Sequence, residues 1–311
     1  MLDALIMAGG RGSRFKIGLE KPLLTVLGIP MIVRVINAVL SSRVVDRIVV
    51  SVSSNTPHTL SLIKSIGDIE VFVSSGKGYV EDVSETIEEL DLRDVLVIPA
   101  DMPLLSGEVL RLIADEFAAR EVDSLVVSMS VSKAKSIGLR PEYIDGDVVI
   151  AGLNVIRREA INRESNIQSY LNLDKYAYNL INVNSLDEYV IAFKEALSRI
   201  FSNKVELANL NELDYYSTIE KSCIEITLKY INHVGTYYGP LPILDKYGKV
   251  VSNSDVIKVF RRAGLLIVPA IIIEDEEVLY SELEKLSNVR VSIPIGEILL
   301  LQKALLDYPD L

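Results

Sequence analysis

The chain has 311 residues, of which 49% are hydrophobic and 24% are charged, and its formal net charge is -11. Such an acidic chain is a poor partner for nucleic acid, because phosphate binding requires a basic surface. No apolar run is long enough for a membrane span, we expect no signal peptide, and the single cysteine, Cys223, excludes an intrachain disulfide. We therefore expect a cytoplasmic protein with one large or two ordinary domains.

Over the first 200 residues, short apolar runs alternate with amphipathic patterns. Apolar runs predict strands over residues 3–8, 47–53, 69–75, 94–100, 124–131, 147–156 and 176–183. Patterns of helical period predict helices over residues 30–42, 57–66, 80–90, 106–120 and 185–200. We expect Thr56 to be the N-cap of the second helix. The alternation predicts a Rossmann-like α/β fold of three layers with a mostly parallel sheet, which binds ligands at the carboxyl ends of its strands.

The pattern changes near residue 200. Residues 201–216 have no strong period, and we interpret them as a linker. Beyond them, helical patterns follow over residues 217–232, 255–264, 278–286 and 296–307, and strand patterns over 265–273 and 289–295. Residues 217–311 are therefore predicted to form a second, smaller α/β domain of unknown role. We expect residues 1–200 to form a self-sufficient catalytic unit.

The loop after the first predicted strand, AGGRGSRFKIGLEKPL (8–23), is a candidate binding site. It is not a dinucleotide-binding loop, because phenylalanine occupies the position of the third glycine, and not a P-loop, because Pro22 follows Lys21. The backbone amides of its glycine turn can approach phosphate oxygens closely, and Arg11, Arg14 and Lys21 add positive charge. We interpret it as a triphosphate-binding loop, with a flexible, solvated turn as the alternative.

This loop resembles the signature loop of nucleotidyltransferases that activate sugars, molybdopterin and cobamide intermediates. Other segments resemble, in the same order, those of the archaeal GTP:adenosylcobinamide-phosphate guanylyltransferases: SSNTPHT (53–59), SSGKGYVEDV (74–83), PADMPLL (99–105), VVIAGLNVI (148–156) and NVNSLDEY (182–189). The resemblance covers residues 1 to about 200. It implies transfer of GMP from GTP to adenosylcobinamide phosphate, which gives adenosylcobinamide-GDP and pyrophosphate in cobalamin biosynthesis or salvage.

Three alternatives remain open. Within the same class, the chain could be a molybdenum cofactor guanylyltransferase or a sugar-phosphate nucleotidyltransferase. In another class, it could be a regulatory nucleotide-binding protein without turnover. Retention of Lys21 and Asp101 counts against the regulatory protein.

Nucleotide binding is assigned from the resemblance and from positions at strand ends. The predicted nucleotide-binding residues are Ala8, Gly9, Gly10, Arg11, Gly12, Ser13, Lys21, Ser75, Gly76, Lys77 and Gly78. The predicted catalytic residues are Lys21, Arg14 and Asp101. The implied reaction is attack by an anionic phosphate on the α-phosphorus, which needs charge neutralisation and positioning more than a base.

Asp101 ends the fourth predicted strand, where a carboxylate can hold Mg²⁺ against the phosphates of the nucleotide. Capping of a nearby turn is the alternative role for Asp101. The resemblance implies a second metal ligand just before the last helix, where Asn184 is the candidate; Asn182 and Asn184 alternate along the chain and would share one face of a strand. Alternatively, Asn184 or Ser185 caps the following helix, and Glu188 completes a capping box if Ser185 is the cap.

The sequence gives weaker evidence for the residues that bind the acceptor and the guanine base. Gly152 and Asn154 are predicted to lie on the acceptor side, where Gly152 permits close approach of a bulky ligand. Glu81 or Asp82 could accept hydrogen bonds from guanine, although acids are favoured in a first helical turn by the helix dipole alone. For residues 217–311 we expect packing against the first domain or against a second copy of the chain in a homodimer, with capture of the corrinoid as the alternative.

Overall fold

The computed structural model describes residues 1–10, 12, 19–67, 69–141, 143–161, 167–201, 204–210, 213, 231, 235–274 and 280–307. The chain divides into two compact units, the first formed by residues 1–24 and 29–188 and the second by residues 25–28 and 189–311. The division falls within the helix α6 (Leu186–Phe201), whereas the sequence suggested a boundary near residue 200.

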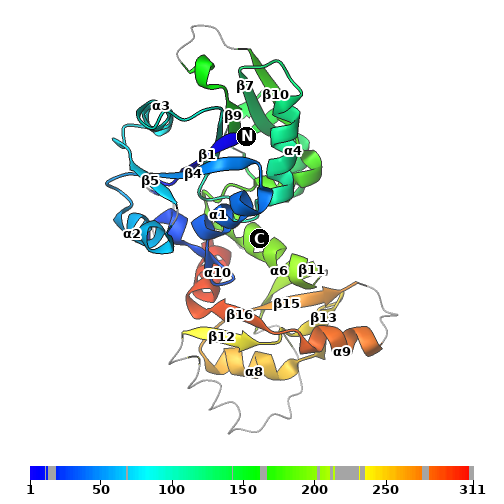
Figure 1. The fold of residues 1–311 in the computed structure, drawn as a ribbon. Helices are drawn as coiled ribbons and strands as arrows, with labels where there is room; N and C mark the ends of the chain where they lie inside the picture. The colour runs from blue at the N-terminus through cyan, green and yellow to red at the C-terminus, as the bar shows by residue number, and fades with distance from the viewer. Residues whose placement is uncertain are drawn as a thin grey trace. The chain divides into compact units, whose positions relative to one another are not determined.

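The first unit is built on an eight-stranded sheet in the order β10-β7-β9-β6-β1-β4-β5, with β8 paired to β9 (Figure 1). Its strands are β1 Leu2–Met7, β4 Val45–Val52, β5 Glu70–Val73, β6 Val95–Pro99, β7 Ser124–Ser130, β8 Ile144–Asp145, β9 Val148–Ile156 and β10 Gln168–Asn172. The strands β5, β4, β1 and β6 pair in parallel along the sheet. The predicted α/β fold with a mostly parallel sheet is thus confirmed.

Helices cover both faces of this sheet. The helix α3 (Tyr79–Glu89) contacts β1 and β4, and its Val83 and Ile87 join Leu5 and Val49 in one buried cluster. Because α3 returns the chain from β5 to β6, it lies on the face opposite α1 (Met31–Ser42), which packs with α4 (Gly107–Ala118). The other elements of this unit are η1 Lys21–Leu23, β3 Ile29–Pro30, α1 Met31–Ser42, α2 Pro57–Ile66, α4 Gly107–Ala118, α5 Val131–Ser136, η2 Arg158–Ala160 and η3 Asp174–Leu180.

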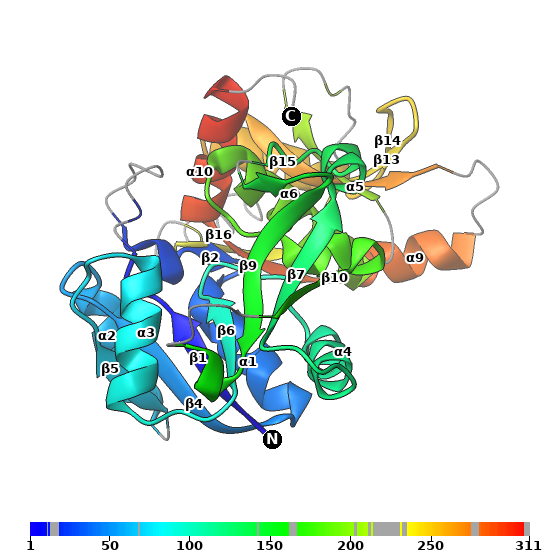
Figure 2. The same cartoon turned by 90° about the horizontal axis from the view of Figure 1, so that it is seen from above.

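The strand β9 runs antiparallel to both of its neighbours, β6 and β7, although parallel strands were expected (Figure 2). Residues 131–147 between β7 and β9 include the helix α5 and the strand β8, which pairs antiparallel with β9. The last residue of β7, Ser130, pairs with the first residue of β9, Val148, so β9 begins beside the end of β7.

Residues 176–183 do not form the predicted strand, so this prediction is wrong. Most of them belong to the 3-10 segment η3, whose buried residues Ala177 and Leu180 are three positions apart, as the 3-10 period requires. The strand at this edge of the sheet is β10, which pairs in parallel with β7. The side chains of β10 are mostly exposed, so it lacks the apolar signal of a buried strand.

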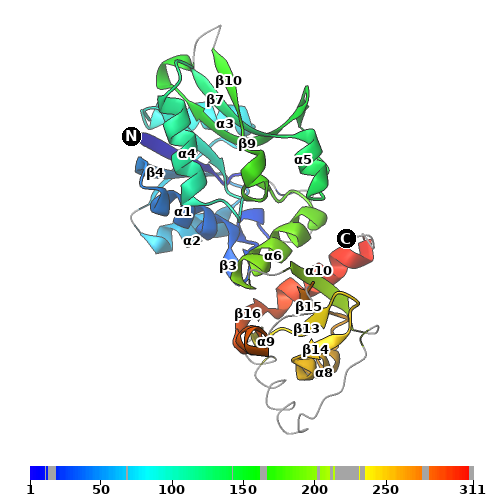
Figure 3. The ribbon, with the colours of Figure 1, turned by 90° about the vertical axis from the view of Figure 1, so that its right-hand side faces the viewer.

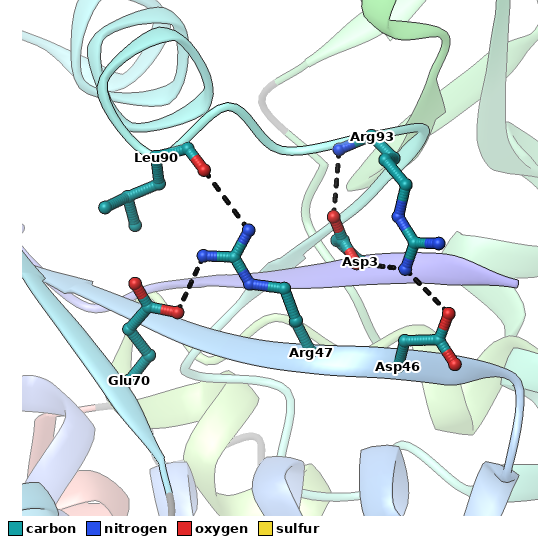
Figure 4. A network of polar contacts seen from close by, with 6 residues as sticks. All are labelled: Asp3, Asp46, Arg47, Glu70, Leu90 and Arg93. Atoms are coloured by element: carbon teal, nitrogen blue, oxygen red, sulfur yellow. Dashed lines mark hydrogen bonds and ion pairs between the residues drawn. The ribbon is translucent and has the colours of Figure 1, made fainter.

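At the amino ends of β1 and β4, a polar network ties the strands to the segment after α3 (Figure 4). The buried carboxylate of Asp3 accepts hydrogen bonds from the backbone N–H of Arg93 at 2.9 Å and from its guanidinium at 3.1 Å. The same guanidinium donates to Asp46 at 2.6 Å. Next to it, Arg47 donates to Glu70 and to the carbonyl at the end of α3. This network fixes the sheet at the edge opposite the carboxyl ends of the parallel strands.

The second unit contains a four-stranded sheet in the order β11-β15-β13-β14 and a two-stranded sheet of β12 and β16 (Figure 3). Phe260 of α8 packs edge-on against Tyr237 of β12, with 4.9 Å between the ring centroids. The elements are β2 Thr25–Val26, β11 Lys204–Asn209, β12 Thr236–Gly239, β13 Ile243–Asp245, β14 Val250–Ser252, α8 Ser254–Arg262, β15 Ile267–Ile273, α9 Tyr280–Asn288, β16 Val291–Pro294 and α10 Ile295–Asp307.

The stretch 201–216, interpreted from the sequence as a linker, contains the strand β11, which pairs antiparallel with β15. This pairing partner is some sixty residues further along the chain, so the local sequence does not reveal it. The helix predicted over residues 217–232 lies outside the described residues, Ile231 excepted. Among the helices that the structure describes, none is long and apolar enough to cross a membrane.

Candidate nucleotide-binding site

A cavity of about 880 Å³ opens in the first unit at the carboxyl ends of its parallel strands. Part of its lining comes from residues 7–10 at the end of β1, Asn55 after β4, residues 76–79 after β5 and residues 99–101 at the end of β6. The strand β9 and residues 180–184 supply further parts. The cavity therefore lies where an open α/β sheet is expected to bind its ligands.

The start of the glycine-rich loop is held against the end of β4. The hydroxyl of Ser53 donates to the carbonyl of Gly9 at 2.7 Å and accepts from the backbone N–H of Asn55 at 3.1 Å. A Cβ at Gly9 would lie only 3.2 Å from the Cβ of Ser53. Gly12 has a φ of +57°, which favours glycine, and a Cβ there would lie 3.3 Å from the Cβ of Lys21. The glycines thus let the loop backbone pass close to its own neighbours beside the cavity.

Glu20 anchors the segment that carries Lys21. Its carboxylate accepts hydrogen bonds at 2.7 Å from the backbone N–H groups of His58 and Thr59, in the first turn of α2, and one at 2.6 Å from the Thr59 hydroxyl. Partial burial alone would raise the pKa of Glu20, but these hydrogen bonds lower it. Thr56 stands at the predicted N-cap position without capping through its side chain. Glu20 caps the helix from 38 positions away, too far for a local pattern to show.

The side chain of Lys21 contacts both predicted metal ligands, Asp101 and Asn184. Its ammonium donates to Oδ1 of Asn184 at 2.8 Å and forms an ion pair with Oδ2 of Asp101. The backbone around Asn184 is fixed by a 2.9 Å hydrogen bond from the N–H of Val183 to the carbonyl of Asp101. Three residues from distant parts of the sequence therefore present one cation and two oxygen ligands at one point of the cavity.

Three buried oxygen atoms of the cavity have no hydrogen-bond partner: Oδ1 of Asp101, of Asn154 and of Asn182. A buried acceptor without a partner is costly, so these atoms are suited to a donor or cation that enters with a ligand. The described residues contain no group of three or more His, Cys, Asp or Glu that could hold a metal ion. A cation here would therefore rely on one carboxylate together with amide oxygens.

Acidic residues of α3 shape the loop 75–78. Oδ1 of Asp82 accepts from the backbone N–H of Gly76 at 2.9 Å, and Glu85 accepts from that of Ser75 at 2.9 Å. The backbone N–H groups of Ser75 and Gly76 therefore donate to protein side chains and not to a ligand. Asp82 lines the cavity and holds the loop, which is a role that its place in the first turn of α3 does not reveal.

Tyr79, the first residue of α3, links this helix to β9. Its hydroxyl donates to the carbonyl of Gly152 at 3.2 Å. Although the residue as a whole is 47% exposed, enclosure of its hydroxyl end and the nearby carboxylate of Asp101 raise the pKa of Tyr79. Gly152 has a φ of +76°, and a Cβ there would lie 3.3 Å from Cγ of Pro99, so this glycine is required for packing between β9 and β6.

Ser185 and Glu188 form the capping box of α6 that the sequence suggested. The N–H of Glu188 donates to Oγ of Ser185 at 3.4 Å, and Oε2 of Glu188 accepts from the N–H groups of Ser185 at 3.1 Å and Asn184 at 2.6 Å. Burial raises the pKa of Glu188 to about 7, although these N–H donors act in the other direction. Since Glu188 also lines the cavity, a carboxyl group that titrates near neutral pH borders the site.

One continuous segment of the chain, residues 129–152, forms an apolar wall of the cavity. This wall consists of Met129, Leu139, Pro141, Val149, Ile150 and Ala151. The glycine loop, Lys21 and Asp101 come from other segments and are polar or charged. The cavity thus combines two kinds of lining, which suits ligands with an ionic part and an apolar part.

Most of the predicted site residues line this cavity. These are Ala8, Gly9, Gly10, Gly12, Lys21, Gly76, Lys77, Gly78, Asp101, Gly152, Asn154 and Asn184. Ser75 does not line it. The predicted residues Arg11, Ser13 and Arg14 lie outside the described residues, as does Cys223. The lining also includes residues without a predicted binding role, namely Asn55, Tyr79, Asn182 and Glu188. For Asn55, its position in the family-like segment SSNTPHT (53–59), two residues after a predicted strand, was the available signal.

Comparison with known proteins identifies NTP transferases as relatives of this chain. The family model described as MobA-like NTP transferase domain matches residues 4–158. Adenosylcobinamide-phosphate guanylyltransferase of Methanocaldococcus jannaschii is 35% identical over 162 residues, which cover 50% of this chain and 80% of that protein. The probable molybdenum cofactor guanylyltransferase of Pyrococcus horikoshii is 32% identical over 116 residues, 37% of this chain and 56% of that protein.

Among solved structures, HddC from Yersinia pseudotuberculosis is similar with a TM-score of 0.49 and 14% identity, covering 63% of this chain and 100% of that chain. The match to the Methanocaldococcus protein covers most of that relative, and the family model spans the strands and loops that line the cavity before residue 158. The chain therefore belongs to the family of MobA-like NTP transferases, and it is a nucleotidyltransferase.

Proposed function

We propose that the chain transfers GMP from GTP to adenosylcobinamide phosphate, forming adenosylcobinamide-GDP and pyrophosphate. The two kinds of lining in the cavity carry this proposal. The glycine loop with Lys21 suits a triphosphate, and the apolar wall of residues 129–152 suits an acceptor with a large apolar surface. A sugar phosphate would leave that wall without a partner. The relative from Methanocaldococcus jannaschii, named for the same acceptor, supports this choice.

In the proposed reaction, an oxygen of the acceptor phosphate attacks the α-phosphorus of GTP. The bond between the α-phosphorus and the oxygen that bridges to the β-phosphate breaks, and pyrophosphate leaves. Because the attacking phosphate is already an anion, the protein has to align the reactants and balance their charge. We assign alignment to the backbone amides of Gly9, Gly10 and Gly12 and charge balance to Lys21, with Arg14 as a second cation. Gly152 and Asn154 lie on the acceptor side of the proposed site.

The residues around Lys21 fit a magnesium ion. Oδ1 of Asp101 is buried without a partner, and Oδ2 of Asp101 and Oδ1 of Asn184 already converge on one ammonium. Carboxylate and amide oxygens are ligands that Mg²⁺ prefers. We infer that Asp101 and Asn184 would hold Mg²⁺. When bound, Mg²⁺ would offset the negative charge of the nucleotide phosphates.

The test is release of pyrophosphate from GTP in the presence of one acceptor at a time. We expect release with adenosylcobinamide phosphate, and none with molybdopterin, with glucose 1-phosphate or with ATP in place of GTP. Release with molybdopterin or the sugar phosphate instead would favour the two rival transferases. Absence of release with adenosylcobinamide phosphate would contradict the proposal.

A variant of the apolar wall tests whether residues 129–152 bind the acceptor. Ile150→Ser should raise the KM for the acceptor roughly tenfold, because apolar contact area is lost, and leave the KM for GTP unchanged. Ile66→Ser is the matched control, because Ile66 is exposed on α2 and does not line the cavity. Equal kinetics for the two variants would show that the wall does not bind the acceptor.

A further inference from the structure

We propose that Glu297 of α10 is a positioning residue for Lys21. Glu297 holds the turn 25–28, which follows the Lys21 segment in the chain and groups with the second unit. The proposal gives the second unit a part in catalysis. It rests on the nucleotidyl transfer of the family and not on the choice of GTP or of the acceptor.

The carboxylate of Glu297 divides its two oxygens between two backbone donors. Oε2 accepts from the N–H of Leu27 at 2.9 Å, and Oε1 accepts from the N–H of Gly28 at 2.8 Å. Glu297 is only 4% exposed, and a buried carboxylate is tolerated only where such bonds satisfy it. Tyr189 holds the same turn, since its hydroxyl donates to the carbonyl of Thr25 at 2.8 Å.

The turn requires these partners because its backbone is unfavourable. Leu27 and Gly28 both have positive φ, +52° and +77°, as in a two-residue type I′ turn. Glycine adopts this conformation readily, whereas leucine, with its Cβ, does not. By accepting from both N–H groups, Glu297 stabilises the conformation that leucine disfavours.

The chain between this turn and Lys21 is short and constrained. Residues Lys21–Leu23 form the 3-10 helix η1, which contains a proline with a fixed φ. The N–H of Leu24 donates to the carbonyl of Lys21 at 3.1 Å. Few free dihedral angles remain, so a displacement of the turn is transmitted to the backbone of Lys21. In this way Glu297 sets where the ammonium of Lys21 meets Asp101.

The test uses two variants of the full chain, Glu297→Gln and Tyr189→Phe. Glutamine keeps the size of Glu297 but offers one acceptor oxygen instead of two, and phenylalanine removes only the hydroxyl. Tyr237→Phe is the matched control, because Tyr237 is similarly buried in the same unit and its hydroxyl donates to the carbonyl of Pro240. Wild type is first assayed with each nucleotide and acceptor above, and the pair that it uses serves for all variants.

We expect kcat to fall roughly tenfold in Glu297→Gln and Tyr189→Phe, and the KM for the nucleotide to change less than about twofold, because Lys21 acts mainly on the transition state. Tyr237→Phe should keep the wild-type kcat at temperatures below its Tm. If Glu297→Gln does not fold, Tyr189→Phe carries the same test. Wild-type kcat in the folded variants would overturn the proposal.

Two double variants separate positioning from a general loss of structure. In the Lys21→Ala background, Glu297→Gln should lower the rate no further, because the group that it positions is gone. Leu27→Gly should restore part of the kcat of Glu297→Gln, because glycine accepts the left-handed conformation without the carboxylate. A further tenfold fall in the Lys21→Ala background, or no rescue by Leu27→Gly, would overturn the proposal.

Discussion

Lys21 and Asp101 form an ion pair at the carboxyl edge of the sheet, with side chains that are 18% and 11% exposed. Lys21 belongs to the loop after β1, and Asp101 follows the end of β6. Because β1 and β6 are neighbouring parallel strands, the ion pair connects the segments that leave them at the same edge of the sheet. Neither charge is fully solvated, and each orients the other. A triphosphate that enters the cavity would bring its negative charge to this ammonium.

Replacement of Lys21 or Asp101 by alanine should abolish most of the turnover while the fold is retained. We expect kcat to fall about 10²–10³-fold in each variant, because charge that develops in the transition state is no longer balanced. The measurement is pyrophosphate release, with circular dichroism to monitor folding. Lys194→Ala is the matched control, because it removes the ammonium that pairs with Glu206 in the second unit. Near-native rates in both site variants would contradict the assignment.

Loss of the Tyr79 hydroxyl should weaken acceptor binding. In Tyr79→Phe the hydrogen bond to the carbonyl of Gly152 is lost, so the start of α3 is no longer tied to β9. We expect the KM for the acceptor to rise about 2- to 10-fold, as for the loss of one hydrogen bond. Tyr176→Phe, which removes a hydroxyl that donates to Glu108, is the control. An acceptor KM that is equal in the two variants would argue against this role.

Glu188 should make the stability of the protein depend on pH. Its pKa is raised from 4.5 to about 7, so the folded state retains a proton that the unfolded state has lost between these pH values. The contribution to the free energy of unfolding is complete below about pH 4.5 and is lost as the pH rises through 7. In Glu188→Gln this dependence, on the order of 3 kcal/mol, should disappear.

Urea unfolding of wild type and Glu188→Gln at pH 4.5, 5.5, 6.5 and 7.5 measures this difference. Glu195→Gln on the same helix, where Glu195 pairs with Arg199, serves as the control and should follow wild type. A constant difference between wild type and Glu188→Gln over this range would show that Glu188 does not bind a proton in the folded state.

The network around Asp3 should contribute to stability and not to turnover. Arg93→Met removes the guanidinium that neutralises the buried carboxylate of Asp3, so we expect a clear fall in Tm (Figure 4). Arg47→Met is the control and should lower Tm less, because its partner Glu70 is 41% exposed. Since both residues lie at the amino ends of the strands, kcat should stay unchanged in both variants. A loss of kcat in Arg93→Met would show that this edge influences the site.

The sequence by itself determined the strands and helices with strong periodicity and the loop that follows β1. Buried strands such as β1 and β6 are apolar throughout, and glycines with adjacent cations mark the loop, so each signal lies within a few neighbouring residues. Because the carboxyl ends of parallel strands lie at one edge of a sheet, Lys21, the loop 76–78 and Asp101 were expected together, and they line one cavity. The resemblance of NVNSLDEY (182–189) to the family led to the last segment of the site, although that segment is not a strand.

Only the tertiary structure decided which partners these residues have. Glu20 caps α2, Glu297 holds the turn 25–28 and Lys21 meets Asn184, and in each case the two groups are distant in the sequence. The antiparallel direction of β9 shows in its pairing with β6 and β7 and not in the pattern of β9 itself. Hydrogen bonds and ion pairs depend on distances of about 3 Å, and those distances exist only after the chain has packed its apolar segments together.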